Sequence, residues 1–272
     1  MTPAPRAPRV RLDVLLVERG LASTRAKAQA LILAGRVASS GVRLDKPGRL
    51  VDPGVALDLA PSPRFVSRGG EKLAPVLAGF GVNPEGRDTL DVGASTGGFT
   101  DALLQAGARR VAAVDVGHGQ LDWTLRNDPR VVVIEGVNAR HLEPARLPFR
   151  PSLAVIDVSF ISLRQVLGPV CTCLALEAEV VALVKPQFEV GRGRVGRGGV
   201  VRDVDLWREV LEGLLAFARL HALGPSGVLR SPLPGVSGNV EFFLHLRPGE
   251  TGAADSALQS ACREATRGQA PS

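Results

Sequence analysis

Two of the four lysines in this chain stand at the borders of strand-like segments. Arginine supplies the other 29 of the 33 basic residues (33 minus 4), so lysine is rare here. Arginine is charged at any workable pH, whereas a lysine amine is a compact charge whose pKa responds to its neighbours. Two amines and two carboxylates near strand ends are candidates for acid–base chemistry. They are Lys72, Asp157, Lys185 and Glu241.

A glycine-rich loop, "LDVGASTGGFTD", is the second candidate site. Its glycines give GxxxGG rather than the GxGxxG of dinucleotide-binding folds, and they let the backbone approach a ligand. Asp115 ends the next strand pattern, "RVAAVDV", where a carboxylate can bind ribose hydroxyls. S-adenosylmethionine, which has a ribose and no pyrophosphate, suits this loop better than a nicotinamide cofactor. The alternative is that the glycines form only a tight turn and that Asp115 caps a helix.

Alternating strand and helix patterns would position these residues. The apolar runs "TLDVG", "RVAAVDV", "VVVIEG", "LAVIDVS" and "EVVALVK" suit buried parallel strands, and "GVLRSPLPG" and "NVEFFLHL" add two late strands. This pattern predicts an α/β fold with a doubly wound, Rossmann-like sheet. Its ligand crevice would lie at the carboxyl ends of the strands.

Positive charge is concentrated in the first quarter of the chain. Residues 1–70 carry 12 Lys and Arg against 5 Asp and Glu, whereas the other 202 residues carry 21 against 22. A basic module beside a near-neutral body favours docking on a polyanion, because neutralised phosphates release counterions. A solvated basic surface without a partner is the alternative.

The basic module reads as a pair of helices followed by a small sheet. We expect helices over 11–19 and up to Leu33, the second capped by Ser23 or Thr24, and strands over 36–38, 42–44 and 55–59. This pattern resembles the small RNA-binding domain of ribosomal proteins and predicts an N-terminal α+β domain over 9–60. The residues expected to form its phosphate-facing patch are Arg11, Arg25, Lys27 and Arg36.

The remaining segments are expected to be irregular. Residues 61–70 are taken as a linker that contains Phe65, residues 71–248 as the α/β domain, and 249–272 as a disordered tail. A glycine-rich loop over 190–203 follows Lys185 and is expected to contact RNA backbone. Its basic residues are Arg192, Arg194 and Arg197.

Seven segments, in order, carry a more specific likeness. They are "SRGGEKL", "DVGASTGGFT", "AVDVGHGQL", "LRNDPRVVVIEGVNAR", "DVSFISL", "VKPQFEVGRGRVGRGGVVRD" and "SPLPGVSGNVEFF". Together they resemble the TlyA family, whose members carry the name haemolysin but act as ribosomal RNA 2′-O-methyltransferases. The resemblance runs from about residue 8 to residue 247.

The resemblance implies an FtsJ-like catalytic sheet with a Lys-Asp-Lys-Glu tetrad formed by the four residues named above. It implies methylation of cytidine ribose in small- or large-subunit rRNA, with rRNA or ribosomal subunits as partners and Arg68 among the RNA contacts. The residues implied to hold S-adenosylmethionine are Gly93, Ala94, Ser95, Thr96, Gly97, Gly98, Phe99, Asp115 at the ribose, Asn138 near the adenine, and Asp157.

The implied chemistry needs no metal. Lys185 would orient a ribose 2′-hydroxyl, and it would accept the proton if burial and the charge of Lys72 favour the neutral amine. The carboxylates would hold the two amines in place. Positioning can lower such a barrier by roughly 7 to 11 kcal/mol in the best cases.

Two other function classes stay open: a membrane-active haemolysin and a noncatalytic ribosome-assembly factor. The amino terminus lacks a secretory pattern, and no run of 18 apolar residues occurs. We therefore expect a cytoplasmic protein that does not span a membrane, and a monomer is the simplest expectation. Three cysteines without metal or disulfide spacing are expected to be reduced.

Overall fold

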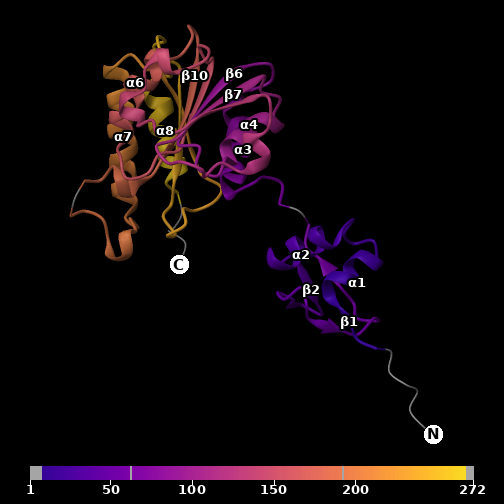
Figure 1. Cartoon of the computed structure of the whole chain (residues 1–272). Helices are drawn as coiled ribbons and strands as arrows, with labels where there is room; N and C mark the ends of the chain where they lie inside the picture. Colours follow the sequence, from indigo (N-terminus) through magenta and orange to yellow (C-terminus); the bar gives the residue numbers. More distant parts are fainter. Residues whose placement is uncertain (1–7, 62, 192, 268–272) are drawn as a thin grey trace. The chain divides into compact units, whose positions relative to one another are not determined.

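The computed structural model describes residues 8–61, 63–191 and 193–267. The chain divides into two compact units, residues 1–63 and 64–272. Both are seen in Figure 1, and each is described by itself. Within the described ranges no helix is both long and apolar enough to cross a membrane.

The small unit contains the predicted helix pair and sheet. Helix α1 spans Leu12–Glu18 and α2 spans Arg25–Leu33, with Thr24 Oγ1 accepting a hydrogen bond from Lys27 N at 3.2 Å. The strands are β1 (Val10–Arg11), β2 (Val37–Ser39), β3 (Val42–Arg43), β4 (Leu50–Val51) and β5 (Asp58–Leu59). Strands β3, β2 and β5 form one sheet, and β1 pairs with β4. The β1–β4 pair was missed because two residues leave no alternating pattern to detect.

The large unit is built on a seven-stranded sheet in the order β11-β12-β10-β9-β6-β7-β8. Six pairings hold it together; β12 is antiparallel to both its neighbours, and the other pairs are parallel. The strands are β6 (Asp88–Val92), β7 (Arg110–Val114), β8 (Val131–Ile134), β9 (Leu153–Ile156), β10 (Glu179–Val184), β11 (Pro225–Arg230) and β12 (Phe242–Leu246). All seven predicted strands are present.

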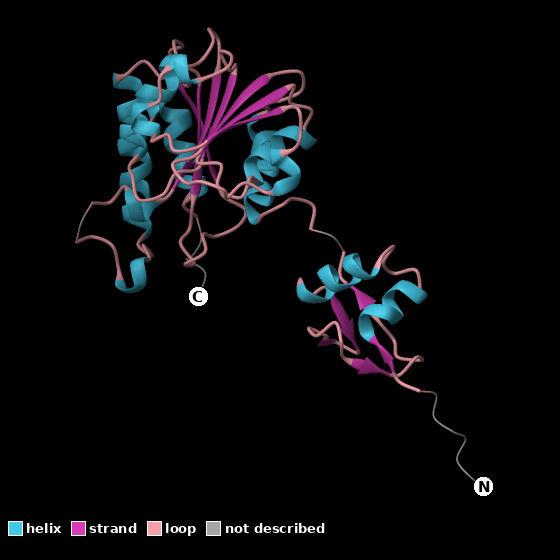
Figure 2. Cartoon of the chain, viewed as in Figure 1, coloured by secondary structure: helices cyan, strands magenta, loops and turns pink. Residues whose placement is uncertain are grey.

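Helices cover both faces of this sheet (Figures 1 and 2). On β7, Ala112 and Val114 pack with one apolar cluster, and Val111 and Ala113 with the other, as expected for a strand buried on both faces. Helices α3 and α4 lie on one face, and α6, α7 and α8 on the other. Their bounds are α3 (Arg68–Phe80), α4 (Gly98–Gln105), α6 (Leu167–Thr172), α7 (Val204–Leu220) and α8 (Asp255–Ala265); a short α5 spans Trp123–Arg126.

The predicted linker is shorter than expected. The second unit begins at Arg64, and α3 begins at Arg68. Phe65 is 4% exposed in the core of this unit, and a Cβ at Gly70 would lie 2.2 Å from its ring. The glycine that suggested flexibility therefore makes room for the aromatic ring.

The predicted disordered tail is wrong for most of its length. Helix α8 packs on the sheet, and Leu258, Cys262 and Ala265 are buried along one face of it. These residues are spaced as on one face of an amphipathic helix. Only the leucine is strongly apolar, so the hydrophobic pattern in the sequence was too weak to predict the helix. Residues 1–7 and 268–272 lie outside the described part of the chain.

Candidate active site

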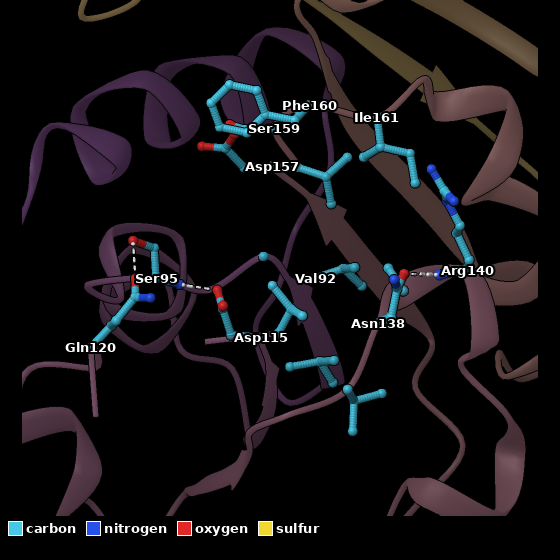
Figure 3. A pocket seen from close by; sticks show the side chains of 16 residues that line it. Val92, Ser95, Asp115, Gln120, Asn138, Arg140, Asp157, Ser159, Phe160 and Ile161 are labelled. Atoms are coloured by element: carbon cyan, nitrogen blue, oxygen red, sulfur yellow. Dashed lines mark hydrogen bonds between the residues drawn. The ribbon is translucent and has the colours of Figure 1, made fainter. Parts of the chain in front are cut away.

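A cavity of about 480 Å³ opens at the carboxyl ends of β6, β7 and β9 (Figure 3). Strand β6 lies between β7 and β9, where the strand order reverses direction, and such switch points are where ligands bind in doubly wound sheets. Its lining includes Gly93, Ser95, Asp115, Asn138 and Asp157, all predicted cofactor residues.

The loop between β6 and α4 requires glycine at its start. Gly93 has φ +85°, and a Cβ there would lie 2.2 Å from the carbonyl oxygen of Asp157. Because this oxygen belongs to the end of β9, the missing side chain lets two strand ends close around the cavity. Any substitution at Gly93 would push these segments apart.

Gly97 has a packing role in this loop, and its predicted contact with the cofactor stays a prediction. It is buried, lines neither cavity of the site, and has φ +96°. A Cβ there would lie 2.4 Å from Leu125 Cδ1 and 2.8 Å from Leu121 Cδ1. The residue therefore serves the packing of the loop against the segment 121–125.

A second hollow of about 310 Å³ lies on the other side of the glycine loop. It shares Gly93, Ser95 and Asp157 with the first cavity. The other predicted residues that line it are Arg68, Lys72, Ala94, Thr96, Gly98 and Phe99. The predicted cofactor residues are thus divided between two adjoining cavities, with Asp157 where they meet.

Asp115 and Asn138 are oriented by backbone groups. Asp115 Oδ2 accepts a hydrogen bond from Ser95 N at 2.8 Å (Figure 3). Its Oδ1 accepts one from Gly117 N at 2.7 Å. Asn138 Oδ1 accepts a hydrogen bond from Arg140 N at 3.0 Å. A carboxylate oxygen accepts more than one bond, so Asp115 retains capacity for hydroxyl donors.

The four tetrad residues form two ion pairs. Lys72 Nζ lies 2.6 Å from Glu241 Oε2, and both residues are buried. Lys185 Nζ lies 2.5 Å from Asp157 Oδ1 and donates a hydrogen bond to Ser159 Oγ at 2.8 Å. Residues separated by up to 169 positions in the sequence are therefore brought into contact.

Sheet register explains how they meet. Val184 of β10 pairs with Phe242 of β12, so Lys185 and Glu241 lie one residue beyond this pair, where β10 ends and β12 begins. Ile156 pairs with Val92, which places Asp157 beside Gly93. Lys72 arrives from α3, on the buried face that also carries Leu73 and Val76.

Burial dominates the electrostatics of the site. Desolvation raises the pKa of Glu241, although the adjacent charge of Lys72 acts to lower it, and Lys185 and Asp157 are close enough to contribute. Burial also raises the pKa of Asp91 to about 7, against a hydrogen bond of 2.7 Å from Thr100 Oγ1 that acts to lower it. Asp91 lies at the penultimate position of β6, beneath the glycine loop. The site is therefore a place where charge is sparsely solvated.

Several neighbours of the tetrad were missed from the sequence. Ser159 accepts a hydrogen bond directly from Lys185. Glu189 fixes the residues that follow Ser159 by accepting hydrogen bonds from Ser162 Oγ at 2.6 Å and Leu163 N at 2.7 Å. Phe160 is 88% exposed with φ +64°, at the wall of the cavity. The quoted segment "DVSFISL" contained the serine and the phenylalanine, but only the fold places the serine against a lysine 26 positions away.

The predicted RNA-binding residues differ in whether their side chains are held by other parts of the protein. Arg11 and Arg25 both bind Asp13, Arg36 Nη2 donates to Ala60 O at 2.7 Å, and the side chain of Lys27 is exposed. Arg68 Nη2 donates to Pro234 O at 2.9 Å at the second hollow.

The loop over 190–203 is only partly described. Arg194 forms an ion pair with Glu209 of α7, with Nη2 at 2.6 Å from Oε2, so its guanidinium is held against that helix. Arg192 lies outside the described residues, and the side chain of Arg197 is not described.

Two family models match the chain. The model for FtsJ-like methyltransferases matches residues 65–248. The model for S4 domains matches residues 10–57. The two matches fall on the large and the small unit respectively.

Individual relatives match most of the chain. It is 50% identical over 243 residues to YqxC of Bacillus subtilis, covering 88% of this chain and 86% of that protein. It is 49% identical over 243 residues to the 16S/23S rRNA (cytidine-2′-O)-methyltransferase TlyA of Mycobacterium tuberculosis, covering 89% and 91%. A solved structure of a hemolysin-named protein from Streptococcus thermophilus has a TM-score of 0.73 at 44% identity, covering 95% of this chain and 94% of its own.

Proposed function

The chain belongs to the FtsJ-like methyltransferase family and, within it, to the TlyA-type proteins, and we propose that it methylates the 2′-oxygen of cytidine ribose in ribosomal RNA. The methyl donor would be S-adenosylmethionine. The observation that carries the proposal is the Lys185–Asp157 ion pair of 2.5 Å, whose carboxylate lines both cavities.

The residues of the first cavity fit S-adenosylmethionine. Asp115 offers carboxylate oxygens for ribose hydroxyls, and Asn138 offers an amide for the adenine. Gly93 lines the cavity, and its missing side chain lets the end of β9 lie close to the glycine loop. The carboxylates of Asp115 and Asp157 also complement the positive charge of a sulfonium and an amine.

The second hollow would receive the ribose. S-adenosylmethionine supplies an electrophilic methyl group, to which the 2′-oxygen forms its new bond as the carbon–sulfur bond breaks. Lys185 Nζ, held by Asp157 and Ser159, would orient the 2′-hydroxyl, and in its neutral form the amine would accept the hydroxyl proton. Lys72, paired with Glu241, lines the same hollow and would fix the position of the sugar.

RNA would be held by both units. The small unit matches the S4 domain and carries four of the predicted basic contacts. In the large unit Arg68 stands at the second hollow, and the exposed ring of Phe160 offers a surface on which a base can stack. The substrate would accordingly be rRNA or a ribosomal subunit in the cytoplasm.

The test is methylation of defined rRNA. The purified chain is incubated with labelled S-adenosylmethionine and unmodified rRNA or ribosomal subunits, and the digested nucleosides are identified by mass spectrometry. We expect 2′-O-methylcytidine, and we expect none from Lys185→Ala at equal RNA occupancy. A methyl group on a base, or on a ribose other than that of cytidine, would overturn the proposed substrate.

A further inference from the structure

In the small unit one carboxylate is buried beneath three donor side chains. Asp13, in the first turn of α1, is 0% exposed. Its Oδ1 accepts a hydrogen bond from Arg11 Nε at 3.0 Å. Its Oδ2 accepts hydrogen bonds from Arg11 Nη2 at 3.0 Å, Arg25 Nε at 2.9 Å and Gln29 Nε2 at 2.8 Å. One side chain thus joins β1, α1 and α2.

The two guanidiniums of this network remain half-exposed. The side chains of Arg11 and Arg25 are 44% and 56% exposed, although the carboxylate between them is inaccessible. A guanidinium has five N–H donors, and the bonds to Asp13 use two of those of Arg11 and one of those of Arg25. The other donors are directed away from Asp13 by the planar geometry of the group.

A basic loop adjoins the same network. Leu12 N donates to Arg49 O at 2.8 Å and Asp13 N donates to Pro47 O at 3.0 Å, so the segment 45–49 is attached to the start of α1. A Cβ at Gly48 would lie 3.2 Å from Arg11 Nη1, which places the guanidinium over the glycine. The loop borders an open hollow lined by Asp45, Lys46, Gly48 and Arg49.

We propose that Asp13 is a positioning residue that holds Arg11 and Arg25 as a two-guanidinium clamp for one backbone phosphate of RNA. The inference rests on the proposed function in that RNA is the ligand of the small unit. Planar guanidiniums match phosphate oxygens in pairs, and Asp13 fixes both planes before RNA arrives, which reduces the ordering cost of binding. The three side chains together carry a net charge of +1 (two arginines minus one aspartate), opposite to that of a phosphodiester.

The clamp and a simple charge effect predict opposite results for one substitution. Asp13→Asn removes a negative charge from a basic surface. If only the summed charge attracts RNA, affinity rises or stays the same. If Asp13 positions the guanidiniums, affinity falls, because an amide releases at least one of the arginines.

The experiment measures the affinity of the full chain for a fluorescently labelled 30-nucleotide RNA hairpin across a series of KCl concentrations. We expect Asp13→Asn to weaken binding about 5- to 20-fold, the range of a lost pair of charge-assisted bonds. Asp58→Asn, an equal charge change at an exposed position of β5, is the matched control and should bind as tightly as the wild type or more tightly. Equal or tighter binding by Asp13→Asn would overturn the clamp.

Two further variants guard against misfolding of Asp13→Asn. Arg11→Lys and Arg25→Lys keep the charge and leave Asp13 a cationic partner, but they remove the planar fork. Each should weaken RNA binding about 3- to 10-fold while the chain stays folded at the assay temperature, which thermal unfolding checks. If both bind like the wild type, positive charge suffices and the clamp is rejected. Competition by inorganic phosphate, matched in ionic strength with chloride, shows whether free phosphate also enters the site.

A methyl-transfer assay distinguishes a failure of the proposed clamp from a failure of the proposed function. At saturating RNA these variants should react at the wild-type maximal rate, while the RNA concentration needed for half that rate increases. A loss of the maximal rate would contradict a role restricted to binding. Absence of methyl transfer in the wild type would reject the proposed function and leave the binding comparison intact.

Discussion

At the scale of single residues, the site depends on where two lysines are held and on what surrounds them. Lys185 has a carboxylate at 2.5 Å and a hydroxyl at 2.8 Å, and Lys72 has a buried carboxylate at 2.6 Å. A guanidinium is larger, planar and permanently protonated, so it neither fits the same contacts nor accepts a proton. The scarcity of lysine in the chain is thus matched by a specific environment for these two.

We predict that Lys185→Arg lowers the rate of methyl transfer by roughly 10²-fold or more, the scale of a lost general base or of lost positioning. Affinity for S-adenosylmethionine, measured by calorimetry, should change little. Arg263→Lys on α8 is a control for the same pair of residue types outside both cavities. A near-normal single-turnover rate in Lys185→Arg would mean that only positive charge is required.

Asp91 gives the fold a dependence on pH. Its pKa in the folded state is raised from the ordinary 3.8 to about 7 by burial, so the folded protein binds this proton more tightly than the unfolded chain. The contribution to stability is complete below pH 3.8 and is lost as the pH rises toward 7. A shift of three units corresponds to at most ~4 kcal/mol.

Asp91→Asn should therefore gain stability relative to the wild type as the pH rises. Between pH 4 and pH 8 we expect the difference in unfolding free energy to move in favour of the variant by about 2 to 4 kcal/mol. Denaturant unfolding at both pH values measures it, and the difference between the two proteins cancels the titration of other groups. A constant difference would mean that the pKa of Asp91 is the same in the folded and the unfolded state.

At the scale of elements, two loops form the site, and one of them is fixed by a half-buried and a buried side chain. Near the start of the segment that follows β10, Glu189 accepts a hydrogen bond from Leu163 N. Near the end of the segment, Asn239 accepts a hydrogen bond from Val201 N and donates one to Gly199 O, both at 2.9 Å. Asn239 is 1% exposed and lies two residues before Glu241. The loop over 190–203 is thus attached to the segment that precedes Glu241 of the tetrad.

The glycine loop supplies the prediction at this scale. Gly97→Val places a branched side chain at φ +96° and within the space of Leu121 and Leu125. We expect a loss of stability of about 3 kcal/mol or more, because backbone strain and overpacking add. Thermal unfolding tests it, and Ser95→Ala at the exposed tip of the same loop should be nearly neutral. A fully stable Gly97→Val protein that fails to bind S-adenosylmethionine would support the sequence-based view of Gly97 as a cofactor contact.

At the scale of the whole molecule, the excess positive charge and the candidate active site fall largely in different units. The excess positive charge lies in residues 1–70, while both cavities of the site are lined by residues of the second unit. The apolar clusters of the two units are also separate. Each unit therefore has its own core.

Removal of residues 1–63 should leave a folded unit that binds S-adenosylmethionine normally and RNA weakly. Fewer phosphate contacts should also flatten the dependence of RNA affinity on salt, by close to one unit of the logarithmic slope for each lost contact. Calorimetry for the cofactor and RNA titrations at several KCl concentrations measure the two effects. An unchanged salt slope would show that RNA docks on the large unit alone.

The amino-acid sequence by itself predicted the strands of the large sheet, the helix pair of the small unit and the four residues of the tetrad. Short, largely apolar runs predicted the strands of the large sheet, most clearly β9 and β10, because a strand buried on both faces is apolar along most of its length. Lys72, Asp157, Lys185 and Glu241 were found through their positions at strand ends and through a family likeness. The helix pair of the small unit followed from its caps, which are local interactions.

Tertiary structure decided what depends on contacts between distant segments. That Lys185 pairs with Asp157 and Ser159, and Lys72 with Glu241, follows from strand order and register, which no local pattern encodes. Contacts with other elements likewise decide the burial of Phe65 and the packing of α8. They also explain why Gly97, which lies against Leu121 and Leu125, has no room for a side chain. Asp13 is the clearest case: an aspartate in an amphipathic helix reads as a surface residue, and only the approach of Arg25 and Gln29 from α2 turns it into a buried anchor.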